Sequence, residues 1–68
     1  MFGFLLNGIT NENVDGVSAD ISRIGAKLVS AQGVFMALVF VDNAELAAKL
    51  LQPTLDLYKL TTIKANVA

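Results

Sequence analysis

Residues 28–41, LVSAQGVFMALVFV, decide the fold of this chain, because this run of fourteen positions carries no charge. Eleven of the fourteen residues are apolar, and the run lies in the middle of a sequence of 68 residues. Such a run must leave water, and a chain this short has little other surface with which to cover it. The sequence therefore predicts that this run is buried within the fold or against a neighbouring molecule.

The composition of the whole chain also indicates more apolar surface than the fold itself can bury. Hydrophobic residues make up 54% of it and charged residues 16%, whereas charged residues are about 25% of an ordinary soluble domain. There is no Cys and no His, so disulfides, thiolate metal sites and the commonest general base are excluded. Without a disulfide or a structural metal, a single small core rarely contributes more than about 3–5 kcal/mol to the free energy of unfolding. We therefore expect association with other molecules, no catalytic activity and no metal or cofactor.

The charge pattern argues against nucleic acid as a partner. The formal net charge is −1, and the five basic residues are scattered along the chain. Binding of nucleic acid needs basic side chains gathered on one surface, where they neutralise a row of phosphates. The basic residues are Arg23, Lys27, Lys49, Lys59 and Lys64.

Apolar spacing in the first two thirds of the chain favours a helix. Eight apolar residues recur at alternating intervals of three and four, which places them on one helical stripe. They are Val14, Val17, Ile21, Ile24, Leu28, Ala31, Phe35 and Leu38. The predicted fold class is therefore mainly α, with one long, glycine-softened helix over about residues 13–52, a kink at Pro53 and an extended tail. As a single domain, residues 1–68 divide into an apolar arm (1–11), a helical part (12–60) and a tail (61–68).

A small α+β fold is the alternative, with residues 34–41 as a buried strand. Gly33 suits the end of a helix near Gln32. Asp42 with Glu45 three residues later resembles a capping box that begins another helix. Periodicity alone cannot decide between helix and strand for so short an apolar run, and the low charge content favours the long helix.

Two sets of residues on the predicted helix are candidates for contact with neighbours. The apolar set comprises Ile21, Ile24, Leu28, Phe35 and Leu38. Small residues on another face would let a second helix approach closely, as in membrane helix packing. This small-residue set comprises Ala26, Gly33 and Ala37.

The widest candidate for a membrane span is residues 24–41, which are eighteen residues long. A span needs roughly 17–25 residues, and Lys27 and Gln32 offset most of the apolar gain. This balance predicts a marginal span and a chain associated with a membrane or a particle. The N-terminus has no basic segment before its apolar stretch, so no cleavable signal peptide is predicted.

The layout resembles that of small phage coat and virion membrane proteins in outline. An acidic N-terminal part (Glu12, Asp15, Asp20) precedes the apolar centre and a C-terminal part of mixed charge. The chain departs from filamentous coat proteins because its C-terminal lysines are dispersed and because Pro53 interrupts this part. The resemblance implies a structural component of a virion and concerns the layout alone.

A polar segment near the N-terminus partly matches a calcium-binding loop. Asn11, Asn13, Asp15 and Gly16 fit its opening, but Ser22 stands at the twelfth position, where a bidentate Glu is required. We therefore interpret the segment as a polar loop with capping side chains.

Three hypotheses of function follow from these patterns. The first is a non-enzymatic structural or assembly protein that packs an apolar helix against copies of itself, a larger complex or lipid. The second is a small soluble α+β binding module that dimerises through its sheet. The third is a holin-like pore former, which depends on the marginal span.

Overall fold

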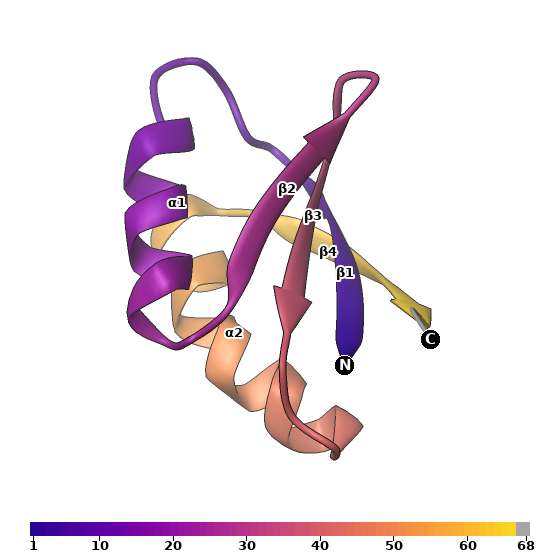
Figure 1. Ribbon diagram of the computed structural model, residues 1–68. Helices are drawn as coiled ribbons and strands as arrows, with labels where there is room; N and C mark the ends of the chain where they lie inside the picture. Colours follow the sequence, from indigo (N-terminus) through magenta and orange to yellow (C-terminus); the bar gives the residue numbers. More distant parts are fainter. Residues whose placement is uncertain (67–68) are drawn as a thin grey trace.

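The computed structural model describes residues 1–66 and shows a four-stranded antiparallel sheet with two helices (Figure 1). The elements follow in the order βαββαβ, and the strands lie in the order β2-β3-β1-β4 across the sheet. This combination is the split βαβ, or ferredoxin-like, arrangement. The elements are β1 (Phe2–Asn7), α1 (Val14–Arg23), β2 (Lys27–Ala31), β3 (Val34–Val39), α2 (Ala44–Tyr58) and β4 (Thr61–Asn66).

The prediction of a mainly α fold is wrong, and the α+β alternative fits. The helical stripe holds through α1 and ends there, because Ile24 is the C-cap and Gly25 follows with φ of +80°. A second interruption comes at Gln32 and Gly33, both of which have positive φ. Residues 13–52 therefore contain the helix α1, a β-hairpin and the start of α2 in place of one long helix.

The prediction of a marginal membrane-spanning helix over residues 24–41 is also wrong. No helix within residues 1–66 is long and apolar enough to cross a membrane. The candidate span 24–41 is divided between the end of α1, the strands β2 and β3 and the segments that join them. Its apolar side chains are distributed over the two faces of a sheet.

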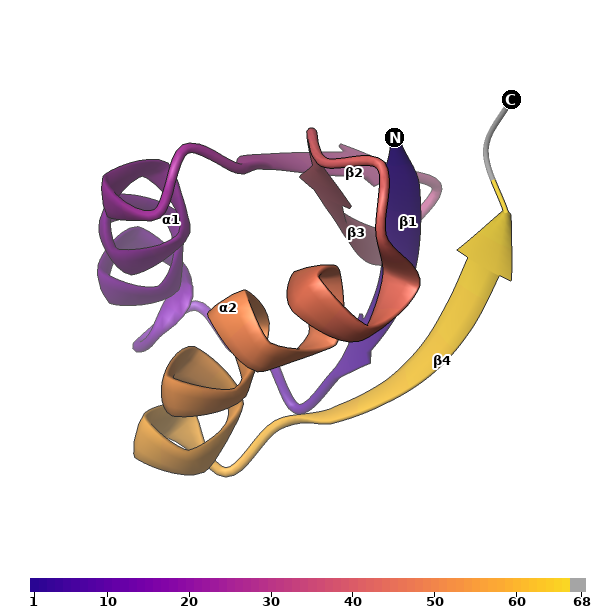
Figure 2. The ribbon, with the colours of Figure 1, turned by 90° about the horizontal axis from the view of Figure 1, so that it is seen from below.

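Both helices cover the same face of the sheet (Figures 1 and 2), and the core lies between the two layers. Inward-facing residues of β1 and β3 meet the buried faces of α1 and α2 there. The buried core residues are Phe4, Leu6, Val17, Ile21, Ala26, Ala37, Val39, Ala47, Leu51, Leu55 and Leu60. The opposite face of the sheet has no helix over it.

The start of α2 differs by one residue from the predicted capping box. Asn43 is the N-cap, and its side-chain oxygen accepts a hydrogen bond of 3.0 Å from the backbone N–H of Leu46. An Asn at this position satisfies a backbone donor that has no partner within the helix. The helix then continues through Pro53 to Tyr58, beyond residue 52, where the predicted long helix ends. Pro53 is exposed, and it removes one i→i−4 hydrogen bond from the interior of the helix at a cost of about 3 kcal/mol.

The turn between β2 and β3 yields a first testable prediction. Gln32 and Gly33 have φ of +53° and +79°, which is the pattern of a type I′ hairpin turn. Asn adopts positive φ more readily than Gln, so Gln32→Asn should raise the free energy of unfolding by about 0.5–1 kcal/mol. Urea denaturation measures this change. Gln32→Ala, which lacks that tolerance, should not stabilise the protein, and equal gains from both variants would contradict the explanation.

Candidate interaction surface

The face of the sheet that carries no helix is apolar, and we call it the open face. Its strand residues with exposed or half-buried apolar side chains are Leu5, Val29, Ala31, Val34, Met36, Leu38 and Ile63. A contiguous exposed apolar patch on a small protein marks an interaction site more often than isolated apolar residues do. The open face is therefore the candidate functional surface of this chain.

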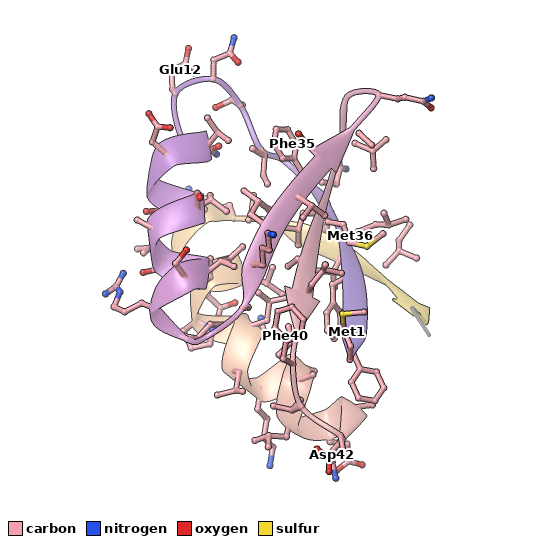
Figure 3. All side chains as sticks on the ribbon, in the orientation of Figure 1. Met1, Glu12, Phe35, Met36, Phe40 and Asp42 are labelled. Carbon is pink, nitrogen blue, oxygen red and sulfur yellow. The ribbon has the colours of Figure 1, made fainter. Side chains whose placement is uncertain are left out.

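The strand β3 shows why the open face forms. Side chains of a strand alternate between the two faces, so Phe35, Ala37 and Val39 point toward the helices. Val34, Met36 and Leu38 occupy the intervening positions and point the other way. Figure 3 shows Met36 directed away from the helical layer. Because both sets are apolar, β3 presents apolar side chains on both faces, although helices cover only one of them.

An apolar row crosses all four strands at the middle of the open face. Residues directly opposite each other in antiparallel strands carry their side chains on the same face. The register places Met36 opposite both Val29 and Leu5, and it places Leu5 opposite Ile63. In the order of the strands, the row is Val29, Met36, Leu5 and Ile63. Four aligned apolar side chains give a surface that water wets poorly.

Charge is nearly absent from this surface. Among the side chains that the structure describes on the open face, Lys27 alone is charged, and it lies on the edge strand β2 opposite Leu38. Asn7 and Thr61, which pair at one end of the face, are polar and uncharged. Depletion of charge at the centre with polar groups at the rim is the composition of a protein–protein interface.

The eight predicted contact residues do not share one surface. Ile21, Ala26 and Ala37 are buried in the core, and Ile24, Leu28 and Phe35 pack against it. Gly33 lies in the hairpin turn. Only Leu38 lies on the open face. The small-residue set is dispersed over three parts of the fold, and the helix face that it was predicted to form does not exist.

Sequence reasoning missed Leu5, Val29, Met36 and Ile63 as contact candidates. Once β1 and β3 are assigned as strands, Leu5 and Met36 are the positions between inward-facing residues, and the register then adds Val29 and Ile63 from the neighbouring strands. Val34 also belongs to this group because 50% of it is exposed. Leu46 on α2 has nearly the same exposure, 47%, but it does not lie on the open face.

A polar contact ties the two helices together on the other side of the molecule. The hydroxyl of Thr54 in α2 donates a hydrogen bond of 2.7 Å to Oδ2 of Asp20 in α1. The guanidinium of Arg23 forms an ion pair with Oδ1 of the same carboxylate. Nearby, Gly16 lies against Tyr58 so closely that a Cβ on Gly16 would stand 2.5 Å from the phenol oxygen. This cluster holds α1 against α2.

The polar segment before α1 uses its side chains to close a loop. Oδ1 of Asn13 accepts a hydrogen bond of 2.7 Å from the backbone N–H of Thr10, and its Nδ2 donates one of 3.1 Å to the carbonyl of Gly8. These are the local side-chain bonds that Asn makes in loops. Within the described chain there is no group of three or more potential metal ligands and no pocket.

Comparisons with protein-family models, with curated proteins and with solved structures find no match to this chain. The split βαβ arrangement supports many unrelated functions. The argument about function therefore depends on the surface described above.

Proposed function

We propose that this chain is a non-enzymatic interaction module that binds another protein through its open face. The observation that carries the proposal is the apolar row that crosses all four strands with no helix over it. Covering this row removes apolar area from water, which contributes about 25 cal/mol per Å². The absence of His and Cys from the sequence also favours binding over catalysis.

A sheet face suits this role because it is broad and rigid. The hydrogen bonds of three strand pairs fix the positions of the apolar side chains before any partner arrives. A partner therefore meets a surface that needs little ordering, which reduces the entropic cost of association. A structural or assembly role would use the same contact.

A matched pair of photocrosslinking variants tests the proposal in the cells that express this chain naturally. Benzoylphenylalanine is placed at Val34 on the open face or at Leu46 on α2, two positions of nearly equal exposure. We expect a discrete crosslinked protein species from position 34 and none from position 46. No crosslinked species from position 34, or equal crosslinking from both positions, would refute the open face as the binding surface.

A further inference from the structure

We infer that the occupant of the open face is a second copy of this chain, seated sheet against sheet. This inference rests on the proposed function and names its partner. Two sheets that pack face to face lie about 10 Å apart, with the side chains of the two inner faces interdigitated. The apolar row of each copy would then lie at the centre of the interface, with Leu5 and Met36 near its midpoint.

The absence of charge from the centre of the open face selects an uncharged partner. A partner with acidic or basic groups over Met36 and Leu5 would have to desolvate them without an opposite charge to pair with. A second copy presents an equally uncharged face of the same width. It also satisfies the requirement of a two-fold dimer that one surface be complementary to itself.

The position of Lys27 is compatible with this symmetry. In aligned face-to-face packing, the two-fold axis lies between the sheets and runs close to the strand direction or close to the direction across the strands. An axis along the strands moves the second Lys27 to the opposite edge of the sheet, about 14 Å away for three strand spacings. An axis across the strands moves it to the other end of β2, about 13 Å away. Both separations exceed the Debye length of about 8 Å at physiological ionic strength, so the two lysines do not oppose the dimer.

The area of the open face sets the expected affinity. Four strands spaced about 4.8 Å apart, with five or six residues rising about 3.3 Å each, cover about 19 by 18 Å. The flat projection is about 350 Å² per copy, or about 700 Å² for the pair. The relief of the side chains makes the accessible area larger than this flat projection. A total of about 700 Å² is below the roughly 1,200–2,000 Å² of stable interfaces and lies in the range of weak, reversible contacts, so we expect a dissociation constant on the order of 100 μM.

Sedimentation equilibrium of the purified chain over about 1 μM to 1 mM tests this inference. We expect the mass to rise from that of one chain to that of two. The double variant Val34→Lys/Ile63→Lys, with both lysines on the open face, should weaken this dimer at least tenfold. The matched double variant Leu46→Lys/Leu57→Lys on α2 should leave the dissociation constant within about twofold.

The two double variants are matched in the exposure of the residues they replace and in the charge they add. Ile63 and Leu57 are 70% and 65% exposed, and each double variant adds the same charge in place of two exposed apolar residues. Circular dichroism confirms that both variants are folded. A wild-type chain that stays monomeric, or a dimer lost in the α2 variant and kept in the sheet variant, would overturn the inference.

The outcome separates this inference from the proposed function. A monomeric purified chain whose position 34 crosslinks in cells to a protein of another mass excludes the second copy and keeps the interaction module. A monomeric chain with no crosslink from position 34 excludes both. An assembly larger than two copies that persists in the Val34→Lys/Ile63→Lys variant also excludes the second copy, since the contact would then use another surface.

Discussion

Replacing Leu51 by alanine is expected to abolish most or all of the stability of the protein. Leu51 lies on α2 and is 1% exposed, in the core between the helices and the sheet. A buried Leu→Ala change costs about 2–5 kcal/mol, because apolar contact is lost and a cavity remains. A single small core rarely supplies more than about 3–5 kcal/mol in total. The variant should therefore be largely unfolded in conditions where the wild type is folded.

Leu57→Ala is the matched control for this prediction. Leu57 lies six residues further along the same helix and is mostly exposed, so the same chemical change should alter the free energy of unfolding by about 0.5 kcal/mol or less. Circular dichroism during urea denaturation measures both variants. Similar losses at the two positions would show that Leu51 does not occupy the core that the structure describes.

Replacing Thr54 by valine is expected to have the second-largest effect. Thr54 is the one buried polar residue in the described part of the chain, and its hydroxyl donates to the Asp20 carboxylate. Valine keeps the shape of threonine but cannot donate. A hydrogen bond to a charged group contributes about 1.5–3 kcal/mol, so the variant should lose stability by that amount. The loss should appear as a lower urea midpoint with an unchanged m-value.

Two further variants identify the cause of that loss. Thr61→Val makes the same change at an exposed strand position and should alter the stability by about 0.5 kcal/mol or less. A double-mutant cycle with Asp20→Ala should give a coupling energy of about 1 kcal/mol or more, since each change removes the same contact. Additive losses would mean that Thr54 stabilises the protein through packing alone.

Part of the fold could be predicted from the sequence because the relevant signals are local. The apolar spacing of Val14, Val17 and Ile21 matches the side of α1 that faces the core. This prediction depends only on the spacing of apolar residues within two turns of helix, and that spacing is visible in the sequence itself. The prediction that Gly33 ends a helix near Gln32 is wrong, because β2 precedes it and Gly33 lies in the turn of the β2–β3 hairpin.

The strands were mistaken for a helix because the open face is apolar. An ordinary half-exposed strand alternates polar with apolar residues, and that alternation is the signal from which it is identified. In β3 the outward residues Val34, Met36 and Leu38 are as apolar as the inward ones, so the signal is missing. The three and four spacing then continues by chance from α1 into Phe35 and Leu38. The feature that hid the strand is the same feature that supports an interaction surface.

The candidate surface could not be predicted because it depends on pairing between distant segments. Leu5 and Ile63 are 58 residues apart, and only the register of β1 with β4 brings them together. No local pattern at either end of the chain encodes that register. A correct strand assignment for residues 34–39 would have indicated Met36, but the row across the sheet requires the strand order as well.

The central position of β1 has a consequence for biosynthesis. This strand is translated before both of its partners, β3 and β4, and β4 ends at residue 66. Until those later segments emerge from the ribosome, Phe2, Phe4 and Leu6 have no sheet to join and remain available to chaperones or to other nascent chains. Contacts between such distant segments slow folding, and transiently exposed apolar segments promote aggregation. The yield of native protein should therefore depend on how quickly the ribosome completes β4.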